Sequence, residues 1–206
     1  QMCIRARLFG ALPCTGGSQW QIVNWKRGPG TQDKIREHWK AFESLFHNFV
    51  KVAAACALNG GHIAVEWPRN CSYWSRPVVR SFLRLYDLID YDFDGCMFGL
   101  CSTAEVTLGK PIKKPWRIAS NIPEFANLRR SCTHLPSEHA TCAGAETKAS
   151  EDYTDALVTS IHCCFTLHVR NLGPGGTEPP LTTHDERGAA KNRGTVRPAK
   201  ANHRRD

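Results

Sequence analysis

The sequence lacks any run of about 18 apolar residues, the length that a membrane-spanning helix needs. Its first nine residues carry arginines and no apolar core, unlike a secretory signal peptide. Neither a G-x-x-x-x-G-K-[ST] nor a G-x-G-x-x-G pattern occurs, which argues against a phosphate-loop hydrolase and a self-contained dinucleotide enzyme. We therefore expect an intracellular protein without a membrane partner.

Composition favours one folded domain with an anionic partner. Apolar residues make up 41% of the 206 positions, which is adequate for a hydrophobic core. The ten cysteines are scattered among helix-length apolar segments, unlike those of small disulfide-dense domains, so we interpret most of them as reduced. The formal net charge of +8 is compatible with nucleic acid as a partner, although a basic balance alone is common.

Alternating strand-like and helix-like segments predict an α/β domain over residues 1–170. The expected elements are strands at 5–12, 62–67, 93–100 and 116–119, helices at 31–58, 77–89 and 123–130, and a final helix or helix-strand pair at 151–167. Such alternation is typical of a mostly parallel sheet with helices on both faces, a Rossmann-like three-layer sandwich. Residues 171–206 have almost no large apolar side chains, which predicts a disordered basic tail.

Two strands of this sheet are followed by residues that can carry chemistry. Cys14 lies in a tight glycine-containing loop after the first strand, where backbone N–H groups would lower the pKa of its thiol. Glu66 ends the 62–67 strand in apolar surroundings, which would raise the pKa of its carboxyl toward neutrality. In a parallel sheet both residues reach the same edge. The alternative for Cys14 is a buried cysteine that packs as a small hydrophobic residue.

The motifs Leu12-Pro13-Cys14-Thr15-Gly16-Gly17-Ser18 and Val65-Glu66-Trp67-Pro68 resemble those of the DNA cytosine-5 methyltransferases, in which one strand ends in a Pro-Cys loop and the next in Glu-Asn-Val. The resemblance implies that Cys14 is the nucleophile that adds to C6 of a flipped-out cytosine, and that Glu66 assists at N3. It also implies S-adenosylmethionine as methyl donor. Arg117, in the string Lys113-Lys114-Pro115-Trp116-Arg117-Ile118, is the nearest counterpart of an arginine that steadies the adduct.

The resemblance covers only the catalytic half of such an enzyme. The cofactor half of the family precedes the Pro-Cys strand, and the eleven residues before Leu12 are too few to form it. We therefore expect a truncated domain, inactive alone, whose cofactor half an upstream segment would supply. The strings Cys96-Met97-Phe98-Gly99-Leu100 and Lys114-Pro115-Trp116 are also similar to methyltransferase-like segments of retroelement-type polyproteins.

A second cluster predicts a metal site. Cys132, His134, His139 and Cys142 lie within eleven residues, flanked by turn-forming residues, and four such ligands can surround zinc tetrahedrally. Their spacing differs from that of a standard zinc finger. The alternative is a polar loop, within 132–142, whose cysteines bind nothing.

Aromatic and arginine side chains interleave after both motifs. Such a set can stack a base and hold its phosphates, or the aromatics can simply pack the sheet edge. The candidates for nucleic-acid binding are Trp20, Arg27, Arg69, Trp74 and Arg76. The rival to an enzyme is therefore a zinc-stabilised nucleic-acid-binding module of a mobile-element protein. The resemblance favours DNA over RNA and thus a nuclear location.

Overall fold

A computed structural model describes residues 6–173, so the expected tail lies outside the described residues except for its first three positions. The described chain forms one sheet in the strand order β1-β2-β4-β3. Its strands are β1 (Arg7–Gly10), β2 (His62–Pro68), β3 (Ile89–Asp94) and β4 (Pro115–Ser120). Strand β1 pairs with β2 in parallel, whereas β4 runs antiparallel to both β2 and β3.

The α/β class is confirmed, but the expectation of a mostly parallel sheet is wrong, because the sheet is mixed. The reason lies in the connection between β3 and β4. Parallel neighbours need a crossover, usually an α-helix. Residues 95–114 contain only the short turns η3 (Gly95–Phe98) and η4 (Glu105–Thr107), so the chain returns from the end at which β3 stopped. Doubly wound sheets often include one reversed strand, so a Rossmann-like relation remains a prediction.

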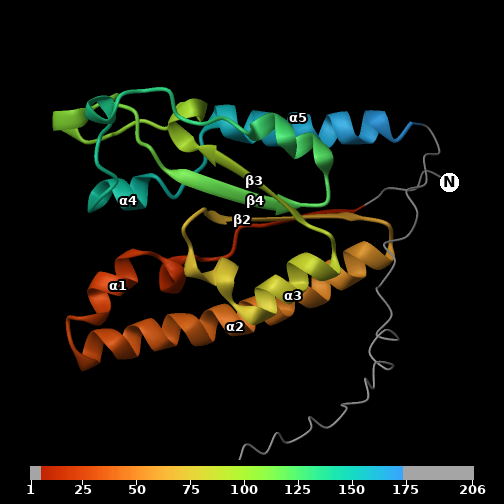
Figure 1. The fold of residues 1–206 in the computed structure, drawn as a ribbon, viewed down its shortest axis with the longest axis horizontal. Coiled ribbons are helices and arrows are strands. Elements are labelled where there is room, and N and C mark those ends of the chain that lie inside the picture. The colour runs from red at the N-terminus through yellow and green to blue at the C-terminus, as the bar shows by residue number, and fades with distance from the viewer. Residues whose placement is uncertain (1–5, 174–206) are drawn as a thin grey trace, which may run out of the picture.

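Helices cover both faces of this sheet (Figure 1). Helices α2 (Pro29–Leu58) and α3 (Pro77–Leu85) lie on one face, and α5 (Asp155–Asn171) lies on the other beside the 3-10 helix η5 (Pro123–Leu128). The short helix α1 (Trp20–Trp25) runs next to α2, and α4 (Ala145–Ala149) precedes α5. The predicted helix at 31–58 is confirmed, with Pro29 in its first turn, where the missing N–H costs nothing.

Each face of the sheet has its own core, because successive strand residues point to opposite sides. The core under α2 and α3 is largely aromatic and includes Phe42, Phe46, Trp67, Tyr73 and Phe82. The core under α5 includes Phe93, Trp116, Ile118, Phe125 and Phe165. Trp67 and Trp116 thus pack on opposite sides of the sheet, so the central strands are covered by large side chains on both faces.

The sequence-based prediction placed one strand too late in the chain. The predicted strand 93–100 begins earlier, at Ile89, and ends at Asp94, where the chain enters the turn η3. Aspartate is rare in strands, so the alternating aspartates of β3 concealed it. Two of them, Asp90 and Asp92, form ion pairs with Arg117 on β4. The predicted helix at 123–130 is the 3-10 helix η5.

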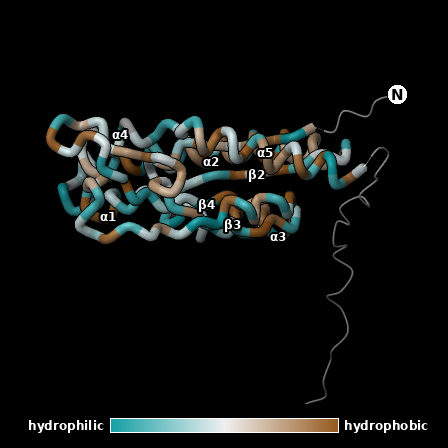
Figure 2. Tube along the Cα trace, turned by 90° about the horizontal axis from the view of Figure 1, so that it is seen from above, coloured by the Kyte–Doolittle hydropathy of each residue, from teal (hydrophilic) through white to brown (hydrophobic). Residues whose placement is uncertain are grey.

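Along the tube in Figure 2, hydrophobic and hydrophilic residues alternate over short stretches, as expected for elements with one buried side. Among the described helices, none is both long enough and apolar enough to cross a membrane.

Candidate functional site

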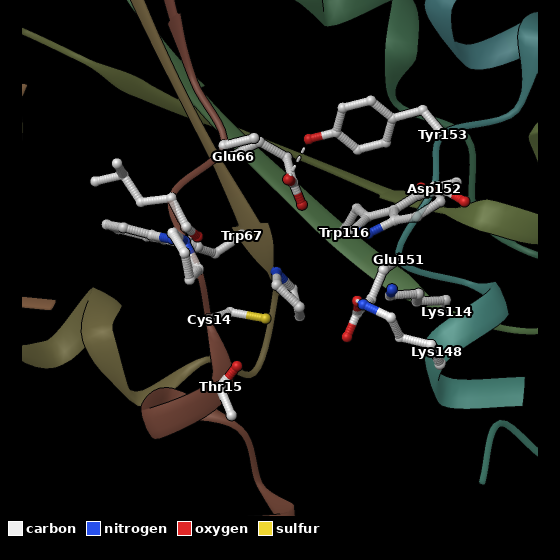
Figure 3. Close-up of a pocket in the computed structure, with 14 residues that line it drawn as sticks. Cys14, Thr15, Glu66, Trp67, Lys114, Trp116, Lys148, Glu151, Asp152 and Tyr153 are labelled. Atoms are coloured by element: carbon white, nitrogen blue, oxygen red, sulfur yellow. Dashed lines mark hydrogen bonds and ion pairs between the residues drawn. The ribbon is translucent and has the colours of Figure 1, made fainter. Parts of the chain in front are cut away.

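A cavity of about 590 Å³ opens where β1 and β2 end (Figure 3). Cys14 and Glu66 both line it, as their positions at the ends of two parallel strands predicted. Its lining consists of Ala11, Leu12, Pro13, Cys14, Thr15, Glu66, Trp67, Pro68, Lys114, Trp116, Lys148, Glu151, Asp152 and Tyr153. The volume lies within the range of small-molecule pockets.

The loop that carries Cys14 is fixed by its neighbours. The indole N–H of Trp67 donates to the carbonyl of Leu12 at 2.8 Å, and the indole of Trp39 donates to the carbonyl of Gly16 at 2.8 Å. A Cβ at Gly16 would lie 2.5 Å from the Tyr73 hydroxyl, and one at Gly17 would lie 2.5 Å from the Cys71 sulfur. The loop glycines therefore serve close packing against α2 and the turn η2 (Ser72–Ser75).

Glu66 is a buried carboxyl with one unpartnered oxygen. Its side chain is 7% exposed, and its Oε2 accepts a hydrogen bond from the Tyr153 hydroxyl. Its Oε1 has no hydrogen-bond partner among the described residues. Burial raises the pKa of Glu66 to about 7, while Tyr153 and Lys114 limit the rise. The expected upward shift is confirmed, and near neutral pH this carboxyl can both accept and donate a proton.

Cys14 differs from the expectation. Burial raises the pKa of its thiol above the ordinary value of 9.0, the charge of Glu66 adds to the rise, and Lys114 opposes it. The predicted lowering by backbone N–H groups is therefore wrong in sign, because desolvation and a nearby carboxylate outweigh them. At neutral pH Cys14 carries its proton, and its sulfur points into the cavity (Figure 3). Nucleophilic attack by Cys14 thus needs a proton acceptor, and Glu66 is the buried carboxylate of the same cavity.

Sequence reasoning missed the opposite wall of the cavity. Lys114 immediately precedes β4, and Lys148, Glu151 and Tyr153 come from α4 and the segment after it. Lys114 had a weak signal, because it lies in a string already singled out. Tyr153 is 87 residues from Glu66 in the chain, and no spacing pattern connects the two residues.

Arg117 does not line this cavity. It pairs with Trp67 in the β2–β4 ladder, whereas Glu66 pairs with Ile118, so Arg117 and Glu66 point to opposite faces of the sheet. Its guanidinium forms ion pairs with Asp90 at 2.9 Å and with Asp92 at 2.6 Å. Lys114, directly before β4, is the basic group that this part of the chain brings to the pocket in place of Arg117.

The five proposed nucleic-acid contacts are divided between surface and core. Trp20, the first residue of α1, is half exposed, and Arg27, two positions after α1, is also exposed. Arg69 is half-buried, and Arg76 forms an ion pair with Glu43 at 3.0 Å. Trp74 is buried and packs edge-on against Trp67, with its indole donating to the Pro68 carbonyl, so it is not open to stack on a base.

Three of the four predicted metal ligands come together. The potential ligand atoms of Cys96, Cys132, His134 and His139 all lie within 4.8 Å of one another. Cys142 lies apart, with its sulfur 3.3 Å from the Ser150 hydroxyl and packed against the α5-side core. Ala140 pairs with Ile112 and donates its N–H to the Pro111 carbonyl, which directs the chain away before residue 142. Cys96, in the turn after β3, replaces Cys142.

No model of a protein family matches the chain, and neither a curated protein nor a solved structure is significantly similar to it. The likeness to the cytosine-5 methyltransferases therefore rests on the two short sequence motifs and stays a prediction.

Proposed function

We propose that the cavity binds a cytosine base of DNA and that Cys14 adds to C6 of that base, with Glu66 carrying the proton. The observation that carries this proposal is the convergence of a thiol and a buried carboxyl with one unpartnered oxygen on a single cavity. A nucleophile beside a proton carrier is the arrangement that covalent catalysis requires. The resemblance of the two motifs supplies the substrate class.

The addition balances without an external acid or base. The Cys14 sulfur forms a bond to C6, and its thiol proton passes to the Glu66 carboxylate. A C4=C5 double bond replaces the C5=C6 and N3=C4 double bonds, and N3 takes the proton from Glu66. One S–H bond is lost and one N–H bond is gained. Tyr153 orients the carboxylate through its hydrogen bond to Oε2, which leaves Oε1 for the moving proton.

The methyl donor that the resemblance implies does not fit the described residues. A donor site of this kind needs a glycine-rich turn that lets a ligand approach the backbone. The glycines beside the cavity, Gly16 and Gly17, are covered by side chains of Tyr73 and Cys71. We therefore derive no methyl transfer from this chain. The proposal therefore includes a partner: a separate segment that binds S-adenosylmethionine and brings it to the base.

Hydrogen exchange at C5 of cytosine tests the addition without a donor. In the adduct C5 is electron-rich, so it takes up a solvent proton and then releases its original hydrogen. DNA with deuterium at cytosine C5 should lose the label in the presence of the chain. Cys14→Ser should slow this loss at least about 100-fold, because the hydroxyl is a far weaker nucleophile. Cys101→Ser is the matched control, since Cys101 is exposed and outside the cavity.

A non-enzymatic nucleic-acid-binding module is the second candidate, and the Cys/His cluster favours it. Such a module binds DNA with an affinity that falls steeply with salt. Equal DNA affinity and equal, negligible label loss in the wild-type and Cys14→Ser chains would support this candidate and contradict the first.

A further inference from the structure

The turn after β3 and the loop at 131–139 meet in a group of sulfur and nitrogen atoms. Cys96 belongs to η3, and Cys132 lies 36 positions later in the chain. Asp94 holds the two segments together, because its N–H donates to the Arg130 carbonyl at 3.0 Å and its Oδ2 accepts the N–H of Cys132 at 2.8 Å. The two segments are therefore held together by hydrogen bonds of Asp94 that do not involve the thiols.

Two of the separations are close to those of tetrahedral coordination. The Cys132 sulfur lies 3.4 Å from Nδ1 of His134 and 3.2 Å from Nε2 of His139. Zinc–sulfur bonds of about 2.3 Å and zinc–nitrogen bonds of about 2.05 Å at a tetrahedral angle place the two ligand atoms about 3.6 Å apart. For these two pairs, a zinc ion between the ligand atoms needs shifts of only a few tenths of an ångström.

The surroundings of the ligands favour binding as well. Nδ1–H of His139 donates to the Leu135 carbonyl at 3.1 Å, which leaves the lone pair on Nε2, the atom that faces Cys132. The turn before it is closed by Glu138, whose carboxylate accepts the Leu135 N–H at 2.6 Å. His134 is exposed, so an ion has a path from solvent.

A buried carboxylate beside the group gives a second, independent indication of a cation. The Asp94 side chain is 4% exposed, and its Oδ1 has no hydrogen-bond partner among the described residues. Leaving a buried carboxylate oxygen without a partner is costly, so this oxygen favours a positive centre nearby even when the zinc's thiolate ligands balance its charge overall.

We propose that Cys96, Cys132, His134 and His139 bind one structural zinc ion that fastens the 131–139 loop to the end of β3. Binding replaces two S–H protons by two sulfur–zinc bonds and adds two nitrogen–zinc bonds, so two protons leave to solvent and the bound zinc carries no net charge. Four protein ligands leave no open position, which is the pattern of a structural rather than a catalytic zinc. The proposal is independent of the reaction proposed for Cys14.

The zinc would also support the distal wall of the cavity. The fastened loop leads through the Ile112–Ala140 bridge into α4 and then to Tyr153. Figure 1 shows α4 on the side of the sheet edge where the strands β1 and β2 end. Loss of the ion should therefore increase amide hydrogen exchange within 131–139 first, while exchange in β2 stays slow.

Native mass spectrometry and X-ray absorption of the purified full chain test this site with zinc alone as the probe. We expect one zinc per chain with two sulfur and two nitrogen neighbours. Cys96→Ser and His134→Ala should each weaken zinc binding at least about 100-fold, since each removes a direct ligand, and the loss should exceed the 10–100-fold typical of supporting residues. Cys142→Ser, which replaces the cysteine outside the group, should leave the affinity unchanged.

His134 is exposed, so its replacement by alanine keeps the proposal testable if the buried Cys96→Ser variant fails to fold. Zinc that survives His134→Ala but is lost in Cys142→Ser would overturn the proposed ligand set. A metal-free chain that is two hydrogens lighter, with a disulfide between Cys96 and Cys132, would overturn zinc binding altogether.

Discussion

The Cys14 cavity and the Cys96 cluster lie at the same edge of the sheet, yet their sulfur atoms have opposite companions. Cys14 follows β1 and shares its cavity with the buried carboxyl of Glu66, whereas Cys96 follows β3 and meets a second thiol and two imidazoles. A carboxylate disfavours a thiolate and accepts its proton, while neutral nitrogen donors share a cation with it. The neighbours, more than the sulfur itself, decide between proton-coupled nucleophilic chemistry and metal binding.

Metal removal should produce the largest difference between the two sites. Free zinc at about 1,000 times its dissociation constant should raise the free energy of unfolding by about 4 kcal/mol, and removal of that zinc with a chelator should lower it by the same amount. Chemical denaturation with and without the chelator measures this change, and His134→Ala should show no dependence on zinc. Identical denaturation midpoints for the wild-type chain in both conditions would argue against a structural ion.

The pH dependence of stability tests the burial of Glu66. Because its folded-state pKa, about 7, lies above the ordinary 4.5, the folded state loses stability as the pH rises from 4.5 through 7. Glutamine does not titrate, so Glu66→Gln should gain up to about 3 kcal/mol relative to wild type between pH 4.5 and pH 8. Denaturation at both pH values measures it, with exposed Glu105→Gln as control. A constant difference between variant and wild type would mean that Glu66 titrates normally.

Tyr153→Phe should change the pH profile of the reaction more than the fold. Attack needs the Glu66 carboxylate as proton acceptor, so label loss from cytosine should rise with pH through the Glu66 pKa. Tyr153 lowers that pKa by its hydrogen bond, and its removal should move the midpoint to higher pH. A shift of one pKa unit would reduce the rate at neutral pH up to about tenfold. A lower rate with an unmoved midpoint would show that Tyr153 acts on packing alone.

Arg117→Ala should have the smallest effect and should leave both sites intact. The half-buried ion pairs with Asp90 and Asp92 contribute about 1 kcal/mol to stability. The rate of label loss should stay within about twofold of wild type, because Arg117 lies on the face of the sheet opposite Glu66. On the same scale, a tenfold loss of rate would correspond to about 1.4 kcal/mol. A collapse of label loss with unchanged stability would restore Arg117 to the reaction.

Local patterns predicted the parts of this fold that local physics controls. The period of α2 and the apolar run of β2 determined their positions, and the end of β2 put Glu66 at the functional edge. The reversed direction of β4 depends on the absence of a crossover helix between 95 and 114, and the sequence pattern, which contains no helix between these two strands, already favoured it over the assumed parallel order. The direction of a strand relative to its neighbour depends on the segment that connects the two strands, and the spacing of residues within a strand does not show it.

The candidate sites show the same limit. Cys14 and Glu66 were found because each lies at the carboxyl end of a recognisable strand, Cys14 in the loop after β1 and Glu66 among the last residues of β2. Tyr153 and Cys96 were missed because tertiary contacts alone bring them to their partners, across 87 residues to Glu66 and across 36 residues to Cys132. Nearness in sequence favoured Cys142 over Cys96, although the Ala140 contacts carry the chain away from the group.

Covalent capture tests the central claim, the reactive cysteine at the end of β1, most directly. DNA that contains 5-azacytosine has a more electrophilic C6 and should form a denaturant-resistant adduct with the chain. Trypsin releases residues 8–26 as one peptide whose only cysteine is Cys14, so mass spectrometry can locate the bond. We predict that the base is attached to this peptide and that Cys14→Ser abolishes the adduct. The absence of any adduct, or attachment to a peptide with another cysteine, would contradict the account.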